Sequence, residues 1–259
     1  MDLNTVQELR DARSPHDWRP GDAWLAGGTW LFSEPQPHLR RLVDLTTLGW
    51  EPLLPTADGG LEIAATATIE RLAAYPHPLF AACAEAFLAS SKVRSVATVG
   101  GNLCTALPAG PMISLTAALD GWCLLVAPDG TRRTLPVAEF VTGDGTTALT
   151  PGELLRSVSL PKAALDRPAA MRQASLYALG RSAALVIGIG QAYTVTASTT
   201  RPYTVRFPAP PTADELAAGI EATVPAQGWF DDVHGTPVWR RHMTFRLAEQ
   251  VRVELAGAS

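Results

Sequence analysis

Apolar residues recur every three or four positions in several segments of the chain, which is the spacing of an amphipathic helix. Leu3, Val6 and Leu9 show this spacing first. Thr212 and Glu215 add the hydroxyl-then-acid order of a capping box. We therefore predict helices over residues 1–12, 79–88, 112–119, 212–224 and about 238–255. A further helix is predicted to begin at Thr68, with this residue as its N-cap.

Runs of apolar and β-branched residues bounded by glycine or proline predict strands. The clearest local structure is a hairpin in which residues 122–127 and 131–135 are joined by a two-residue turn at Asp129-Gly130. We predict further strands over 24–26, 41–45, 61–65, 184–199 and 203–207, and short elements over 137–141 and 153–160.

Helices and strands are mixed throughout, which indicates an α/β or α+β protein built of subdomains. We expect an α+β fold, with a domain boundary in the polar, proline-bounded stretch 161–168. The expected units are a first subdomain over 1–55, a second over 56–163 and a smaller C-terminal α+β domain over 164–259.

The composition excludes several functional classes. The chain has 259 residues, 47% of them apolar, and a net charge of −4, which argues against a disordered protein and against nucleic-acid binding. No apolar run reaches the roughly 18 residues of a membrane-spanning helix, and the N-terminus lacks the pattern of a secretory signal, so we expect a cytoplasmic protein. The three cysteines form no Cys-x-x-Cys pair and the five histidines are scattered, so we expect no metal site.

Two paired-glycine segments are the strongest candidates for a binding site. Gly27-Gly28-Thr29 follows a predicted strand and Gly100-Gly101-Asn102 precedes a predicted helix, so each has the sequence of an anion-binding nest. Taken singly, each is more often a tight turn or a close backbone crossing. The neighbouring Thr29, Thr98, Asn102 and Thr105 could bond phosphate or ribose oxygens, or simply stabilise turns.

Other motifs are weaker. Gly188-Ile189-Gly190 lacks the third glycine of a dinucleotide fingerprint and no helix is predicted after it, so a Rossmann site is disfavoured. Cys104 lies within the second glycine segment, where we expect packing rather than reactivity. Trp30 directly follows the first glycine pair, where its ring could lie along a cofactor.

Taken in order, the segments 25–29, 42–45 and 97–102 closely resemble the FAD-binding medium subunit of the molybdenum hydroxylases, the family of xanthine dehydrogenase and carbon monoxide dehydrogenase. Residues 152–161, 180–183, 232–236 and 239–240 extend the resemblance over nearly the whole chain. The resemblance implies two α/β subdomains that hold an extended FAD, with the smaller α+β domain behind them. It implies cofactor contacts at Leu25, Ala26, Gly27, Gly28, Thr29, Trp30, Leu31, Thr98, Gly100, Gly101, Asn102, Thr105 and Leu155.

The resemblance also implies a division of labour in a heteromer. A molybdopterin large subunit would oxidise the substrate, an iron–sulfur small subunit would relay electrons, and FAD on this chain would pass them to NAD or another acceptor. The chain itself would hold no catalytic residue and no metal. The main alternative is a non-catalytic homologue that serves as an assembly or binding module, because Trp30 and Pro111 stand where the family often has aspartates and the segment around Tyr177 replaces a lysine.

Overall fold

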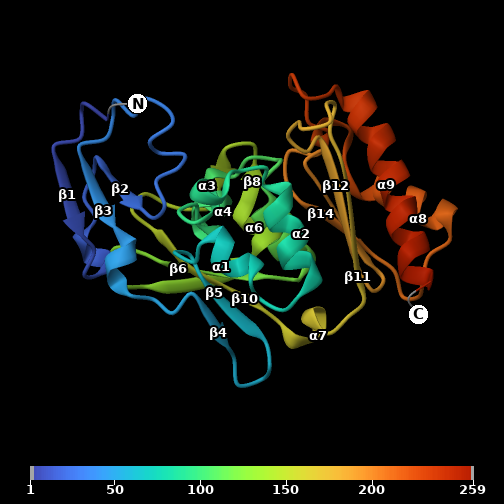
Figure 1. Ribbon diagram of the computed structural model, residues 1–259, viewed down its shortest axis with the longest axis horizontal. Coiled ribbons are helices and arrows are strands. Elements are labelled where there is room, and N and C mark those ends of the chain that lie inside the picture. The colour runs from blue at the N-terminus through green and yellow to red at the C-terminus, as the bar shows by residue number, and fades with distance from the viewer. Residues whose placement is uncertain (1–2, 258–259) are drawn as a thin grey trace.

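A computed structural model describes residues 3–257 of the chain. The three larger β-sheets lie one after another along the long axis of the molecule, with helices packed around the second and third (Figure 1). The N-terminal sheet lies at one end, a five-stranded sheet with most of the short helices lies in the middle, and a four-stranded sheet covered by two helices lies at the other end. The α+β fold class predicted from the sequence is confirmed.

The N-terminal sheet is parallel, in the order β1-β3-β2. Its strands and the two short 3-10 helices beside them are β1 (Glu8–Asp11), η1 (Pro15–Asp17), β2 (Asp22–Leu25), β3 (Arg41–Asp44) and η2 (Leu45–Leu48). The helix predicted over 1–12 is wrong where the structure describes it, and residues 1–2 lie outside the described part. The backbone of β1 pairs with β3, and Leu9 is 63% exposed, so the apolar spacing did not mark a buried helix face.

The middle sheet is antiparallel, in the order β4-β5-β10-β6-β7. Its strands are β4 (Leu53–Pro55), β5 (Leu61–Ala64), β6 (Trp122–Val126), β7 (Arg132–Pro136) and β10 (Leu154–Leu160). The predicted hairpin is confirmed as β6–β7. Its connection is one residue longer than predicted, because the amide of Ala127 still bonds to the carbonyl of Thr131, 2.9 Å away.

Short helices and one small ribbon pack around this sheet. They are α1 (Ile69–Ala73), α2 (Pro78–Ala86), α3 (Ser91–Arg94), α4 (Val99–Thr105), α5 (Pro111–Ala118), α6 (Val137–Phe140), α7 (Lys162–Leu165) and the pair β8 (Val141–Gly143) and β9 (Thr146–Thr147). Thr68 caps α1 as predicted, accepting a hydrogen bond from the amide of Arg71.

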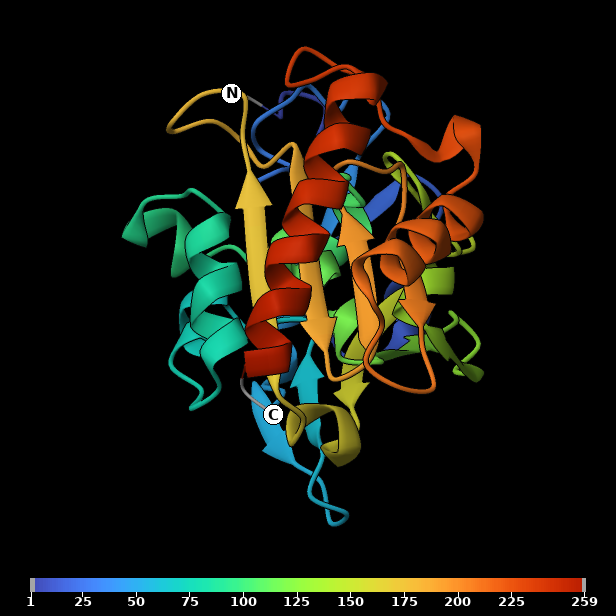
Figure 2. The same cartoon turned by 90° about the vertical axis from the view of Figure 1, so that its right-hand side faces the viewer.

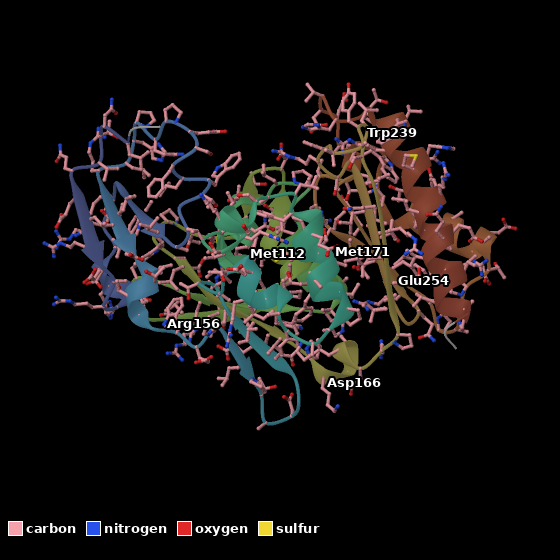
Figure 3. All side chains as sticks on the ribbon, in the orientation of Figure 1. Met112, Arg156, Asp166, Met171, Trp239 and Glu254 are labelled. Atoms are coloured by element: carbon pink, nitrogen blue, oxygen red, sulfur yellow. The ribbon has the colours of Figure 1, made fainter. Side chains whose placement is uncertain are left out.

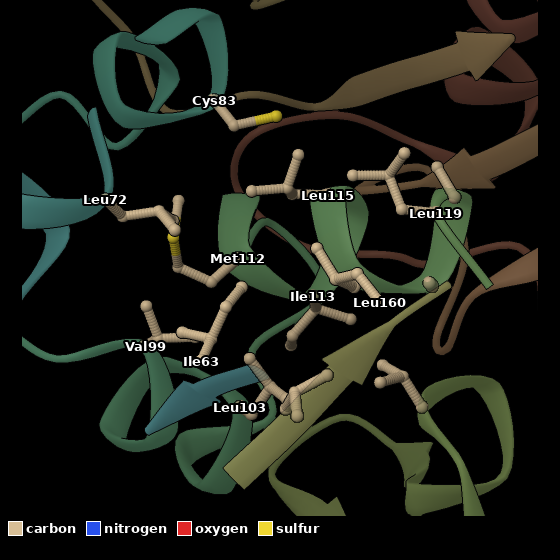
Figure 4. Packing of buried hydrophobic residues seen from close by; sticks show 14 of the residues in the cluster. Ile63, Leu72, Cys83, Val99, Leu103, Met112, Ile113, Leu115, Leu119 and Leu160 are labelled. Atoms are coloured by element: carbon tan, nitrogen blue, oxygen red, sulfur yellow. The ribbon is translucent and has the colours of Figure 1, made fainter. Parts of the chain in front are cut away.

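Helix α5 is the centre of the main core, because every one of its residues is buried. Met112, Ile113 and Leu115 pack with side chains of α4, β5 and β10 (Figure 4). The same cluster continues into the third sheet through Leu185, Ile187 and Ile189. A single apolar core therefore connects the middle sheet to the C-terminal sheet.

The C-terminal sheet is antiparallel and sequential, and α9 lies diagonally across its outer face (Figure 2). Its elements are β11 (Ala169–Ala174), β12 (Ala184–Ile189), β13 (Ala192–Thr196), β14 (Tyr203–Arg206), α8 (Ala213–Thr223), η3 (Ala226–Gly228) and α9 (Pro237–Gly257). The apolar run 184–199 is two strands rather than one, because Gly190 takes a φ of +55° and reverses the chain. Gly188 and Gly190 thus belong to a β-hairpin, which agrees with the sequence argument against a Rossmann site at this segment.

A buried arginine fixes α9 to this sheet. Arg240 is 1% exposed and donates to the carbonyls of Gly235, Ala183 and Ala197, at 2.8, 2.7 and 2.6 Å. It also pairs with Asp232. A buried charge is tolerated only when its donors are satisfied in this way, so Arg240 holds the start of β12 and the end of β13 against the helix.

Candidate functional site

The two glycine segments, about 70 residues apart, converge on one cavity of about 890 Å³. The cavity lies between the end of β2, the start of α4 and the loop that connects β11 to β12. Its volume is within the range of small-molecule and cofactor sites. All of the residues that the resemblance assigned to the cofactor line its wall: Leu25, Ala26, Gly27, Gly28, Thr29, Trp30, Leu31, Thr98, Gly100, Gly101, Asn102, Thr105 and Leu155.

The first glycine segment is a turn with unused backbone donors. After β2 ends at Leu25, the amide of Phe32 bonds to the carbonyl of Gly28 at 2.8 Å, which closes one helical turn. Gly28 itself has a φ of +69°, a conformation that favours glycine. Within residues 3–257, the amides of Gly27, Gly28 and Thr29 have no hydrogen-bond acceptor. Three adjacent free N–H groups on a cavity wall are the donors that a diphosphate requires.

Gly27 has a second role, which is to bring the two segments together. A Cβ at this position would lie 2.0 Å from the carbonyl oxygen of Val96, on the segment that leads into the second glycine pair. Real atoms cannot approach so closely, so only glycine permits this contact. Gly27 is therefore at a close backbone crossing, the alternative that the sequence left open for each glycine pair. This crossing places the free amides of the first segment beside α4.

The second segment differs from the prediction. Gly100 and Gly101 lie inside the first turn of α4 rather than before a helix. Their amides are already bonded, that of Gly100 to the carbonyl of Ala65 at 2.9 Å and that of Gly101 to the hydroxyl of Thr98 at 3.0 Å. The amide of Asn102 bonds to the carbonyl of Thr98 at 3.0 Å. The predicted anion nest is wrong for this segment, because its donors are used in the helix and its cap.

The polar side chains of the second segment also make local bonds. Thr98 caps α4, Thr105 donates to the carbonyl of Gly101 at 2.7 Å, and Oδ1 of Asn102 accepts from the amide of Met112 at 3.0 Å. Asn102 thus satisfies the start of α5, and its NH2 group makes no bond within the described chain. These residues stabilise the wall, and Asn102 keeps one donor for a ligand.

What the second segment offers a ligand is space. A Cβ on Gly100 would lie 2.5 Å from Cβ of Ala65, so Gly100 permits α4 to pack on β5. A Cβ on Gly101 would meet a single neighbour within 4 Å, Oγ1 of Thr98 at 2.9 Å. Because Gly101 lines the cavity, its missing side chain leaves room there for a group that approaches the helix.

Two charged side chains line the cavity, and they differ in their pairing. Glu153 is 5% exposed and accepts from Arg133 at 2.6 Å. Burial alone would raise the pKa of Glu153, but the hydrogen bonds from Arg133 and from the amide of Thr150 outweigh it and hold the pKa below its ordinary value. Arg181 is exposed and has no ion pair within residues 3–257, so it is the free cation of the wall.

Cys104 is exposed on the cavity wall, whereas the sequence suggested that it would be buried in packing. Desolvation of its sulfur by the surrounding protein raises the pKa of the thiol to about 12, so the thiol is protonated at neutral pH and a weak nucleophile. Cys83 and Cys123 are buried. No cluster of three potential metal ligands occurs among the residues that the structure describes, and no helix within 3–257 has the length and apolarity to cross a bilayer.

Sequence reasoning missed the far wall of the cavity. This wall is formed by Phe87, Leu88 and Val93 around α2 and α3, and by Leu179 and Arg181 in the β11–β12 loop. Leu88 and Leu179 are 50% and 91% exposed, and no glycine motif marks either side chain. Of the atypical positions, Trp30 and Pro111 line the cavity, whereas Tyr177 does not.

Comparison with known proteins gives a match over the part of the chain that contains both glycine segments. A family model described as the FAD binding domain in molybdopterin dehydrogenase matches residues 2–163. The chain belongs to this family. The match confirms the resemblance seen in the sequence and establishes FAD as the cofactor of the family domain.

Curated relatives of this FAD-binding chain are similar over part of their length. The nicotinate dehydrogenase FAD-subunit of Eubacterium barkeri is 28% identical over 179 residues, which is 64% of this chain and 58% of that protein. The xanthine dehydrogenase FAD-binding subunit of Escherichia coli O157:H7 is 30% identical over 145 residues, 53% of this chain and 49% of that subunit. The chain therefore spans about half of the curated relatives that it matches.

Solved structures share the fold over the full length. A chain of carbon monoxide dehydrogenase from Oligotropha carboxidovorans has a TM-score of 0.82 at 20% identity, with 98% of this chain and 99% of that chain covered. A chain of quinoline 2-oxidoreductase from Pseudomonas putida 86 has a TM-score of 0.80 at 20% identity, with 100% and 99% covered. At this identity the likeness establishes the fold.

Proposed function

We propose that this chain binds FAD in the cavity between the two glycine segments and serves as the electron-transferring subunit of a cytoplasmic molybdenum hydroxylase. The observation that carries the proposal is the row of free amides at Gly27, Gly28 and Thr29 on the wall of a cofactor-sized cavity. These amides would hold the diphosphate without a lysine, and the open side of Gly101 would let it lie close to α4.

The other wall residues would orient the cofactor. Leu25 and Leu155 are 8% and 3% exposed and would enclose a ring against apolar carbon. The free NH2 of Asn102 would donate to a cofactor oxygen. When bound, FAD accepts and donates electrons one or two at a time, while the protein fixes its position and excludes water.

The cysteine content supports the proposed place of the chain in electron transfer. An iron–sulfur cluster needs four ligands, and this sequence has three dispersed cysteines. Electrons would come from an iron–sulfur small subunit, which a molybdopterin large subunit would reduce, and would leave to NAD or another acceptor. The relatives named for nicotinate and xanthine dehydrogenase support this assignment.

A visible absorption spectrum of the purified chain tests the cofactor proposal. We expect the two flavin bands, in the blue and near ultraviolet, and release of FAD rather than FMN on denaturation. A colourless chain that fails to bind added FAD would contradict the proposal and favour the assembly-module alternative, for which the bonded amides of α4 are the structural argument. Co-expression with the cluster-bearing subunits tests electron transfer, since their reduction by substrate should bleach the flavin bands.

A further inference from the structure

A second cavity, of about 410 Å³, lies behind the FAD cavity. It is enclosed by the connection between β1 and β2 and by the five-stranded sheet. Trp24 and Leu154 belong to the walls of both cavities, so the two sites are separated by single side chains. The volume suits a small metabolite.

The charge of this second cavity is opposite to that of the chain. Three arginines, Arg13, Arg132 and Arg156, line it together with one carboxylate, Glu62, which gives a local net charge of +2 (three positive minus one negative). The whole chain carries −4. Arg13 and Arg132 make no ion pair within residues 3–257, and the nearest oxygen of Glu62 is 3.8 Å from Arg156. Arg156 is thus paired with Glu62, and Asp17, outside the lining, lies within electrostatic range of Arg13, so Arg132 is the arginine of the lining without an acidic partner in the described chain.

Arg156 is held in place inside this cavity. Its guanidinium lies over the ring of Trp50, 4.2 Å from the ring centroid, and its side chain is 28% exposed. Figure 3 shows it on the five-stranded sheet, on the side toward the N-terminal sheet. Burial lowers the pKa of Arg156, Glu62 opposes the shift, and the like charge of Arg132 adds to it. An anion between Arg132 and Arg156 would relieve both effects.

We propose that this second cavity binds a small molecule through a doubly charged oxyanion, a phosphate group, independently of FAD. Guanidinium groups match the geometry of phosphate oxygens and form bidentate pairs with them. A phosphate monoester carries about two negative charges at neutral pH, which equals the local excess of positive charge, whereas a single carboxylate would leave one charge unbalanced. Trp50 and Trp24 supply apolar surface for the rest of the molecule.

The test is calorimetric titration of the FAD-saturated chain with inorganic phosphate at low ionic strength. We expect saturable binding that acetate does not reproduce. Arg132→Gln should weaken binding about tenfold, which corresponds to about 1.4 kcal/mol. Glu62→Gln should strengthen it severalfold, because the cavity then carries +3. Arg71→Gln is the matched control, since Arg71 is an exposed arginine of α1 outside the cavity.

Fluorescence of the flavin-free chain gives a second readout, because Trp24 and Trp50 line the cavity. Phosphate should change the emission of these tryptophans in the native chain and in Arg71→Gln. The midpoint of this change should lie at a phosphate concentration about tenfold lower than in Arg132→Gln. Thermal midpoints of the flavin-free variants confirm that each is folded, and Arg13→Gln replaces Arg132→Gln if the latter is not.

Several results would overturn the proposal. Absence of heat with phosphate would do so, as would equal weakening by Arg132→Gln and Arg71→Gln, which would indicate diffuse surface attraction. Acetate binding as tight as phosphate would refute a dianion site. Phosphate binding that disappears on FAD saturation would show that the second cavity is part of the cofactor site. Failure of FAD binding with intact phosphate binding would refute the proposed function alone.

Discussion

Replacement of Gly101 by valine is the most informative perturbation of the proposed cofactor site. The new Cβ would meet Oγ1 of Thr98 at 2.9 Å and otherwise extend into the cavity. Helix α4 should tolerate the change. Loss of the bond from the amide of residue 101 to the hydroxyl of Thr98 costs about 1 kcal/mol of stability, and replacement of a glycine within a helix offsets part of this cost. The proposed FAD site should not tolerate it, because the proposal requires the diphosphate to lie against this turn of α4.

The expected loss follows from the donors of the first segment. If the displaced diphosphate loses two of the three bonds from Gly27, Gly28 and Thr29, each worth about 1.5–3 kcal/mol to a charged acceptor, affinity falls by about 3–6 kcal/mol. That is a factor of about 10²–10⁴ in the dissociation constant. The assay is quenching of flavin fluorescence on titration of FAD with the flavin-free chain, with thermal midpoints as the measure of folding.

Two other glycines separate ligand space from stability. Gly49 has a φ of +61°, so Gly49→Ala introduces backbone strain, although the new Cβ would meet no atom within 4 Å. Because Gly49 lies outside the cavity, the free energy of unfolding should fall by about 1 kcal/mol without loss of FAD affinity. Gly100→Ala should destabilise the fold through the contact with Ala65. FAD affinity of folded Gly101→Val equal to that of the native chain would refute this reasoning.

Three further predictions concern single side chains. Arg240→Ala should lower the free energy of unfolding by about 3–5 kcal/mol, measured by urea denaturation, because it removes the ion-pair partner of Asp232 and the guanidinium that donates to three carbonyls. A loss below about 1 kcal/mol would contradict this. The lowered pKa of Glu153 means that the folded state binds fewer protons than the unfolded state. Its contribution to stability is therefore complete above the ordinary value of 4.5 and is lost as the pH falls through the lower folded value. Arg133→Gln should weaken this pH dependence of the urea midpoint, measured from about pH 6 to about pH 3, roughly 1.5 units on each side of the ordinary value. Cys104 should react slowly with iodoacetamide at neutral pH because of its raised pKa, and bound FAD should protect it; equal rates with and without FAD would place the cofactor elsewhere.

The sequence predicted the elements whose signals are local. The capping box at Thr212 and Glu215 starts α8, Thr68 caps α1, and Asp129-Gly130 lies in the β6–β7 connection. Each of these signals depends on residues within about four positions, so neighbouring chemistry decides the structure. The long helix α9 was also predicted, from its amphipathic spacing.

Elements that depend on distant partners were predicted poorly. Strand β1 forms because β3, about 30 residues later, supplies its hydrogen bonds, and its own apolar spacing gave the wrong period. Strand β11 was missed because its pairing with β12 is what makes it a strand. The turn at Gly190 was hidden within one apolar run.

The candidate site shows the same division. The glycines identified the two segments, but the sequence could not say which amides would be free, because the acceptors are the carbonyl of Ala65 and the hydroxyl of Thr98. Nor could it reveal that Gly27 serves a contact with Val96. These roles arise from the packing of α4, which lies about 70 residues from the first segment.

The most direct measurement is a crystal structure of the chain saturated with FAD. The free amides of Gly27, Gly28 and Thr29 are predicted to lie within about 3 Å of diphosphate oxygens, with the cofactor passing over Gly101. A diphosphate bound elsewhere, with those three amides facing only water, would contradict the central claim.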